Sequence, residues 1–453
     1  MLRIVFAAPH FPPRHIGGTE RVVERLARRF KEKGYSIDVI AVEAIDQKGG
    51  KVICQVEDFD GINVYRLNLP EAPLENRFTW TYRNPLLGDW FRMYMDNAKP
   101  DILHFHSGYL ISASMLEAAL EKKLPIIVTL HDYWFICPLI TLLRTNGDLC
   151  AEPVPTSRCV WCMLSEKRRY RFPDEALKGM PGVLFSKMAA NEAVAKTIGT
   201  YTLMQKMEQR RSYLKKILEE VDIVTSPSRF LKTKFSDYDI YPKRFIHLPF
   251  GLEINRTSLM GEASPDETVL RIGYLGQIAH HKGVHVLLKA FQNLNVTHRK
   301  AELYIYGDGS RRPDYMALLM RIANDHPAIY FQGKYSASEV DRVLDSLDVV
   351  VVPSIWYENR PTVILEAFSR RKPVVVSNLG GMAEMVTQDV DGLNFRVGDP
   401  IDLAKKIQYI LDNRDVLPRL ASAIPPVKAV EDEVGELESL YIAVTENHNT
   451  ANI

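Results

Sequence analysis

Residues 349–367, VVVVPSIWYENRPTVILEA, run from an apolar strand pattern through a polar loop into a helical pattern. The four consecutive valines have the length and the β-branched side chains of a strand that is buried on both faces. Proline is favoured in the first turn of a helix, so Pro361 predicts where the helix begins. Glu358 would then lie just before this helix and Glu366 inside it.

The same alternation of strand and helix recurs along the rest of the chain. An amphipathic helix pattern begins at Thr19, and Gly34 ends it. Alternating strands and helices predict an α/β fold with parallel sheets covered by helices on both faces. The predicted strands are residues 4–8, 37–41, 101–105, 126–130, 245–248, 270–275, 303–306, 329–332, 348–352 and 374–377.

Two such blocks predict two Rossmann-like doubly wound domains that face a cleft, with a join near Pro249-Phe250-Gly251. The expected divisions are 1–250, 251–430 and a C-terminal helix and tail at 431–453. The helical pattern over 430–446 could pack on either domain. Residues 163–216 carry 12 Lys/Arg against 5 Asp/Glu and predict a helical insertion with a basic face. That face could be a solvated surface or a contact with a membrane or polyanion.

Composition excludes several classes of protein. The 453 residues carry 57 Lys+Arg and 56 Asp+Glu, so net charge gives no argument for nucleic-acid binding. No apolar stretch reaches the ~18–20 residues of a membrane span. Residues 1–8 resemble a strand rather than a secretory signal, so a cytoplasmic location is expected, including the inner face of the membrane.

Special residues gather at predicted strand ends, where ligands bind in open α/β sheets. Gly17-Gly18 follows the first strand and opens a helix, and it is not the G-x-G-x-x-G fingerprint of dinucleotide enzymes. His131 follows the strand 126–130, and Lys282 lies between the strand 270–275 and a helix. Each has an ordinary structural alternative: a tight turn, a core or capping histidine, or a surface lysine.

Four motifs occur together and in order: Gly17-Gly18-Thr19-Glu20, the G-x5-K-G loop that ends at Lys282-Gly283, the E-x7-E pair Glu358/Glu366, and Gly380-Gly381-x2-Glu384. In this combination the chain resembles the retaining GT-B glycosyltransferases of family 4, over nearly its whole length. The resemblance implies transfer of a hexosyl unit from a UDP- or GDP-sugar to a hydroxyl of a saccharide or lipid-linked acceptor.

The resemblance also implies roles for single residues. Glu358 is similar to the glutamate that contacts donor-sugar hydroxyls, and Glu366 to the one that binds the ribose. Lys282 is similar to the lysine that neutralises the diphosphate, assisted by Gly17-Gly18 and the amides near Thr362. His131 is similar to the active-site histidine near the donor sugar.

One position departs from the family pattern. Gln277 stands where the family's loop commonly carries arginine, and a neutral amide cannot bring that charge to the leaving group. Arg360 could compensate from the neighbouring loop. Two other classes of function remain alternatives: a non-catalytic nucleotide-sugar-binding subunit, which Gln277 makes conceivable, and a sugar-nucleotide epimerase of the same fold, against which the Glu358/Glu366 pair argues.

Catalysis without a cofactor is expected, since lysine and helix N-termini can stabilise a diphosphate without a divalent ion. Asp58-Phe59-Asp60 superficially resembles the metal-binding D-x-D motif of another glycosyltransferase fold. Cys137, Cys150, Cys159 and Cys162 form C-x12-C-x8-C-x2-C, which could hold a structural zinc ion or an iron–sulfur cluster, or could remain unligated.

Two further features have several interpretations. The aromatic stretch 78–94 could be core, an acceptor-binding surface or a membrane-surface wedge. His104 and His106 lie on a predicted strand, and their imidazoles are expected to point to opposite faces. The expected partners are a nucleotide-sugar donor, a saccharide or lipid-linked acceptor and the membrane surface, without nucleic acid.

Overall fold

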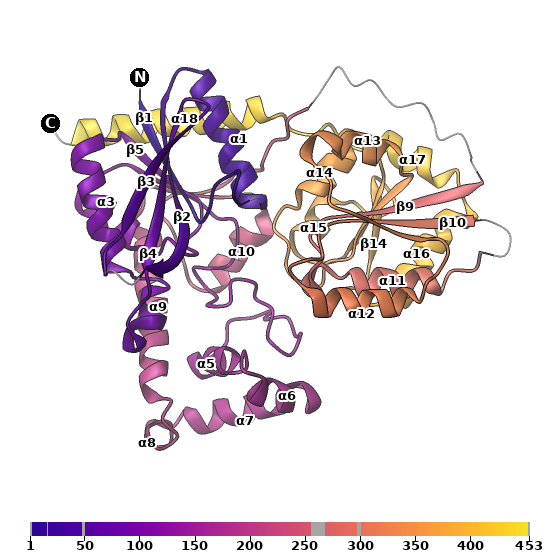
Figure 1. Cartoon of the computed structure of the whole chain (residues 1–453), viewed down its shortest axis with the longest axis horizontal. Helices are drawn as coiled ribbons and strands as arrows, with labels where there is room; N and C mark the ends of the chain where they lie inside the picture. The colour runs from indigo at the N-terminus through magenta and orange to yellow at the C-terminus, as the bar shows by residue number, and fades with distance from the viewer. Residues whose placement is uncertain (1, 16, 48–49, 255–267, 297–299, 452–453) are drawn as a thin grey trace. The chain divides into compact units, whose positions relative to one another are not determined.

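The computed structural model describes residues 2–15, 17–47, 50–254, 268–296 and 300–451, and these form two α/β units (Figure 1). Unit 1 comprises Met1–Pro249 and Glu431–Ile453, and unit 2 comprises Phe250–Val430. The boundary falls at the Pro249-Phe250 peptide. The C-terminal helix, for which sequence left the choice open, belongs to unit 1.

Unit 1 contains an eight-stranded sheet in the order β3-β4-β2-β1-β5-β6-β7-β8. All neighbouring strands are parallel except β3 and β4, an antiparallel hairpin at one edge. The strands are β1 (Arg3–Ala8), β2 (Ser36–Gln47), β3 (Ile53–Phe59), β4 (Ile62–Pro70), β5 (Ile102–Phe105), β6 (Ile126–Thr129), β7 (Ile223–Ser226) and β8 (Phe245–His247).

The helices of unit 1 connect these strands, and a helical insertion lies between β6 and β7 (Figure 1). They are α1 (Gly18–Glu32), the short turn η1 (Leu74–Asn76), α2 (Arg77–Trp80), α3 (Pro85–Ala98), α4 (Ser114–Glu121), α5 (Thr156–Leu164), α6 (Arg168–Ala176), α7 (Met180–Ala189), α8 (Glu192–Thr197), α9 (Tyr201–Glu220), α10 (Arg229–Asp237) and α18 (Val430–Ala451).

Helix α18 packs into the core of unit 1. The ring centroid of Tyr441 lies 5.0 Å from that of Phe30 on α1, and its hydroxyl is 2.6 Å from His104 Nδ1 on β5. Tyr441 is fully buried. The last helix of the chain therefore completes the same layer as α1.

Unit 2 contains a six-stranded parallel sheet in the order β11-β10-β9-β12-β13-β14. Its elements are β9 (Val269–Leu275), η2 (His280–Lys282), α11 (Val284–Gln292), β10 (Lys300–Tyr306), α12 (Pro313–Ala323), β11 (Ile329–Gly333), η3 (Ala337–Glu339), α13 (Val340–Asp345), β12 (Val349–Val352), α14 (Thr362–Ser369), β13 (Val374–Ser377), α15 (Gly380–Met385), β14 (Gly392–Phe395), α16 (Pro400–Asp412) and α17 (Val416–Ala423).

The four valines of β12 show why this sheet is buried on both faces. Val349 and Val351 pack into a core with α11, α12 and α16, whereas Val350 and Val352 pack into a second core with α13 and α14 (Figure 1). Successive side chains of a strand point to opposite faces. The strand order places β12 next to β9, so the loops that follow these two strands emerge side by side at one edge.

Candidate functional site

Two loops of unit 2 are locked together at this edge: the turn η2 after β9, and residues 353–361 between β12 and α14. The amide of Ile355 donates to the carbonyl of His281 at 2.8 Å. Gly283 has φ +72°, and a Cβ there would lie 1.8 Å from the Pro353 carbonyl oxygen. Only glycine fits this close approach in the left-handed region, so the K-G pair of the motif has a backbone reason.

The contact between the loops brings Lys282 to Glu358. Lys282 Nζ lies 2.6 Å from Glu358 Oε1, and the same oxygen accepts from Ser354 Oγ and from Trp356 Nε1, each at 2.8 Å. Burial opposes ionisation of Glu358, but the charge and hydrogen bonds of these partners outweigh it and lower its pKa. The carboxylate is therefore charged and nearly enclosed, while Lys282 keeps 23% of its side chain exposed.

The glycine pair after β13 packs against the backbone of the loop that carries Glu358. The amide of Gly381 donates to the Glu358 carbonyl at 2.8 Å. A Cβ on Gly381 would lie 1.6 Å from the Asn359 carbonyl oxygen, so the backbones meet too closely for any side chain. Gly380-Gly381 therefore positions the loop that carries Glu358.

The other predicted residues of unit 2 lie on the same two connections. Gln277 is exposed, and its carbonyl accepts from the Tyr274 hydroxyl at 2.6 Å. Arg360 is half-buried and precedes α14, which begins at Thr362, one residue after the predicted start. Glu366 is half-buried in the second turn of α14.

Sequence reasoning missed a third loop at this edge, between β10 and α12. A Cβ on Gly307 would lie 2.0 Å from the Gly276 carbonyl oxygen, so this loop packs against the one that carries Gln277. Its Asp308 has a pKa lowered to about 2, chiefly because Ser310 donates to it and also because Lys334 lies 3.0 Å away. Gly307-Asp308-Gly309, directly after a predicted strand, was the available signal.

His281 lies near residues of all three loops, namely Lys282, Arg312 and Trp356. Burial lowers its pKa to about 4, with further contributions from the charges of Lys282 and Arg312, so the ring is neutral at pH 7. It also contacts Trp356 edge-on, with ring centroids 5.1 Å apart.

In unit 1 the buried His104 and His106 and the half-buried His131 form a cluster at the ends of β5 and β6. His106 Nδ1 lies 2.9 Å from His131 Nε2, and His104 Nε2 lies 2.7 Å from Thr129 Oγ1. The prediction that His104 and His106 face opposite ways is wrong, since their ring centroids are 4.0 Å apart. Residues two apart in an extended chain share a face. Burial lowers the pKa of His104 and of His131 to about 3, so both are neutral.

The start of α1 contributes the glycine pair of unit 1. A Cβ on Gly17 would lie 2.4 Å from the Glu20 carboxylate, whereas nothing lies within 4 Å of one on Gly18. The helix N-terminus is thus open at Gly18, as an anion site requires. Asp132, next to His131, accepts from Ser107 Oγ at 2.9 Å, and burial raises its pKa to about 6.

The metal hypotheses find no support in the geometry of the described ranges. Cys137, Cys150, Cys159 and Cys162 are free thiols, and no group of three or more His, Cys, Asp or Glu among the described residues could hold a metal ion. Burial raises the pKa of Cys137 to about 11 and that of Cys162 to about 12. Zinc or iron–sulfur binding here stays an untested prediction.

Asp58-Phe59-Asp60 spans the end of β3 and the start of the turn that leads to β4. Asp58 Oδ1 accepts from the Gly61 amide at 3.1 Å, and Asp60 pairs with Arg28. Both carboxylates thus have a local structural role in the hairpin.

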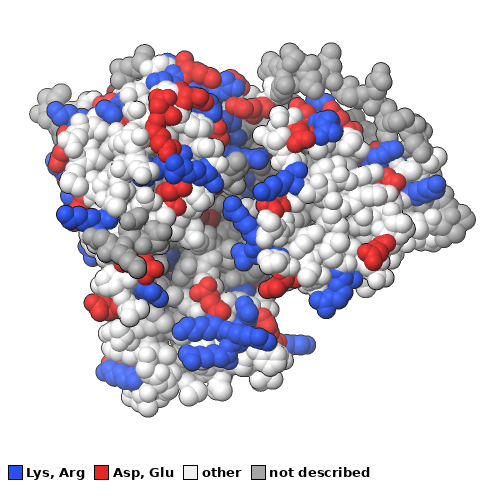
Figure 2. Space-filling view, in the orientation of Figure 1, with Lys and Arg blue, Asp and Glu red and all other residues white. Residues whose placement is uncertain are grey.

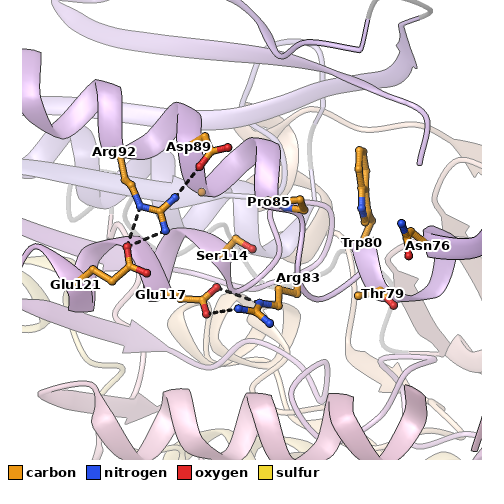
Figure 3. Close-up of a pocket in the computed structure, with 11 residues that line it drawn as sticks. Asn76, Thr79, Trp80, Arg83, Pro85, Asp89, Arg92, Ser114, Glu117 and Glu121 are labelled. Carbon is orange, nitrogen blue, oxygen red and sulfur yellow. Dashed lines mark hydrogen bonds and ion pairs between the residues drawn. The ribbon is translucent and has the colours of Figure 1, made fainter. Parts of the chain in front are cut away.

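A pocket of about 430 Å³ lies elsewhere on unit 1, against α2, α3 and α4 (Figure 3). Two ion pairs cross from α3 and its preceding loop to α4: Arg83 with Glu117, and Arg92 with Glu121. None of the residues predicted to bind a donor lines it. In the aromatic stretch, Tyr82, Phe91 and Tyr94 belong to the core, while Trp80 lines this pocket.

Comparison with known proteins defines the class. The fold matches sucrose-phosphate synthase from Thermosynechococcus elongatus with a TM-score of 0.66 at 18% identity, over 99% of this chain and 100% of that one. The Anabaena protein HepE in complex with UDP and glucose matches with a TM-score of 0.62 at 14% identity, over 98% and 100% of the chains. The fold is that of a GT-B glycosyltransferase.

Sequence comparison gives the family. Residues 16–152 match the model of Glycosyltransferase Family 4, and residues 255–424 match that of Glycosyl transferases group 1. An uncharacterised glycosyltransferase of Methanocaldococcus jannaschii is 23% identical over 416 residues, which are 91% of this chain and 90% of the relative. The chain belongs to the group 1 glycosyltransferases of family 4, enzymes that use nucleotide sugars. No described helix is both long and apolar enough to span a membrane.

Proposed function

We propose that the protein transfers a hexosyl unit, with retention at the anomeric carbon, from a UDP- or GDP-sugar to a hydroxyl of a saccharide or lipid-linked acceptor. The observation that carries the proposal is the contact of Lys282 with the buried, charged Glu358 at the edge where parallel strands end. Of the two nucleotides, UDP has additional support, since the structurally similar HepE was solved in complex with UDP and glucose.

The Lys282–Glu358 pair suits a donor that carries charge at one end and hydroxyls at the other. The partly exposed side chain of Lys282 can turn to the diphosphate, and the N-terminus of α14 at Thr362 adds amide donors. Glu358 is then left to accept hydrogen bonds from the sugar, and Glu366 from the ribose. In unit 1, His131 is neutral at pH 7, so it can accept or donate a hydrogen bond without adding charge.

Retention without a protein nucleophile follows a front-face path. The bond between the anomeric carbon and the diphosphate oxygen breaks, and its electron pair stays on the diphosphate. The acceptor oxygen bonds to the anomeric carbon on the same face, and its proton passes to the leaving phosphate oxygen. Lys282 and the N-terminus of α14 stabilise the negative charge that develops on the diphosphate, so a divalent ion is not required.

A panel of UDP- and GDP-sugars tests the proposal. Calorimetry identifies the donor, and NMR of products with saccharide and lipid-linked acceptors reads the anomeric configuration. Retained product is the expected result. Donor binding without turnover would instead favour the non-catalytic subunit, for which the neutral, exposed Gln277 is the argument.

A further inference from the structure

The insertion between β6 and β7 presents an apolar surface to solvent. Seven large apolar side chains between residues 172 and 198 are exposed by 41% or more, a concentration not matched elsewhere in the described ranges. They are Phe172, Leu177, Met180, Val183, Leu184, Met188 and Ile198, and we call them the apolar surface of the insertion.

Helix α7 shows that this exposure is built into the fold. Its inner face, Gly182, Phe185, Ser186 and Ala189, packs on α5: a Cβ on Gly182 would lie 2.1 Å from Arg158 Nη1, and the ring centroid of Phe185 is 5.2 Å from that of Trp161. Its outer face carries Met180, Val183, Leu184 and Met188, which are exposed by 68, 48, 61 and 46%. The helix is thus apolar on both faces, and among the described residues only the inner face is covered.

The scaffold beneath α7 is held by a buried carboxylate. Asp174 on α6 is 3% exposed and accepts from Trp161 Nε1 on α5 at 2.9 Å and from the Gly182 amide at 3.1 Å. These bonds tie three helices together, so the outer face of α7 is held in place rather than left to collapse.

Positive charge surrounds the apolar surface. Between residues 166 and 198 seven exposed Lys and Arg stand against three exposed Glu. Figure 2 shows several Lys and Arg side chains, among fewer Asp and Glu, on the visible side of the insertion. The basic residues are Lys167, Arg168, Arg169, Arg171, Lys178, Lys187 and Lys196.

We propose that this surface docks the protein on an anionic lipid bilayer, with the outer face of α7 inserted among the acyl chains and the basic residues at the lipid phosphates. An apolar helix face with flanking Lys and Arg suits a peripheral membrane contact, since both attractions act together. A protein partner would need negative charge to complement this excess of positive charge. A second copy of the chain carries the same positive charge on this surface and would be repelled. The inference adds a partner to the proposed function and does not depend on transfer chemistry.

Vesicle flotation of the full chain tests the docking surface. We expect binding to phosphatidylcholine mixed with phosphatidylglycerol, weaker binding to phosphatidylcholine alone, and loss of affinity as salt is raised. Leu184→Gln should weaken binding to the mixed vesicles about tenfold. Ile401→Gln, at a position on α16 of unit 2 that is also 61% exposed, should leave it unchanged.

A second variant tests the charge separately. Arg168→Gln, Arg169→Gln and Arg171→Gln together leave the apolar surface intact and should cost about fivefold in affinity per residue. Circular dichroism and donor binding check that each variant is folded. The proposal is overturned if the wild type ignores mixed vesicles, if Leu184→Gln binds like Ile401→Gln, or if Leu184→Gln instead abolishes self-association seen by ultracentrifugation without vesicles. Because vesicle binding is read without donor or acceptor, a failed transferase proposal would leave this result standing.

Discussion

Lys282 and Glu358 are 76 residues apart in the chain, yet Nζ and Oε1 lie 2.6 Å from each other. The turn that carries Lys282 and the loop that carries Glu358 follow adjacent parallel strands, β9 and β12. Gly283 and Gly381 permit the close backbone approaches that hold the two loops in register. The pair is therefore a product of the sheet order and of two glycines.

Replacing the carboxylate separates its structural role from its role toward donor. Glu358→Gln keeps the shape but removes the charge that faces Lys282, so we expect a loss of about 1–3 kcal/mol in the free energy of unfolding. Turnover should fall about a hundredfold, since a preorganised polar contact to the donor is lost. Urea unfolding and initial rates measure the two effects. A variant as active as the wild type would contradict the role given to Glu358.

The stability of unit 2 should depend on the ionisation of Glu358. Its folded pKa is lowered, so its contribution to stability is present above the ordinary glutamate pKa of about 4.3 and is lost as the pH falls through the lower folded value. Urea midpoints measured from pH 7 down to pH 3 should therefore decline below about pH 4. The decline should be smaller in Glu358→Gln, and identical profiles would count against this coupling.

Gly283→Ala tests the close approach of the two loops. The substitution puts a Cβ 1.8 Å from the Pro353 carbonyl oxygen, in addition to the strain of a positive φ. Gly398→Ala is a matched control, with φ +71° and nothing within 4 Å. We expect the control to lose about 1 kcal/mol of unfolding free energy and Gly283→Ala to lose more, together with donor affinity. Equal losses of unfolding free energy in the two variants would mean that the two loops can move apart without destabilising the protein.

Gln277 tests whether the missing arginine matters. The side chain is exposed, so Gln277→Arg can add a cation at the proposed diphosphate site without repacking the core. We expect kcat to rise severalfold while the free energy of unfolding is unchanged, because a charged donor strengthens hydrogen bonds to a leaving anion. Arg360→Ala should lower kcat if Arg360 supplies that charge in the native protein. An unchanged rate in both variants would remove the argument from charge.

Much of the fold could be predicted because the strands of the two sheets are short, apolar and β-branched. The runs of valine predict strands at 348–352 and 374–377, and the structure has them at Val349–Val352 and Val374–Ser377 with both faces buried. Strand β3 is missed because it is an edge strand rich in polar residues: every residue of Ile53–Phe59 is exposed or half-buried. Strand β7 is missed because it is only four residues long, Ile223–Ser226, and follows the long helix α9 almost directly.

The candidate site was predictable in position but not in contacts. A loop after a strand and a helix N-terminus can be read from local pattern, so Lys282, Glu358 and Thr362 were placed at strand ends. That Ser354 and Trp356 donate to Glu358, or that Gly307 packs on the Gln277 loop, depends on which strands are neighbours. The prediction that His104 and His106 point to opposite faces is wrong for another reason: residues two apart in a strand share a face.

Calorimetric titration of UDP- and GDP-sugars into the wild type and into Lys282→Met tests the central claim most directly. The account predicts that the wild type binds one class of nucleotide sugar and that Lys282→Met, still folded by circular dichroism, binds it at least a hundredfold more weakly, about the effect expected for losing a buried charge-assisted contact to the diphosphate. Equal affinity of the two proteins for the donor would contradict it.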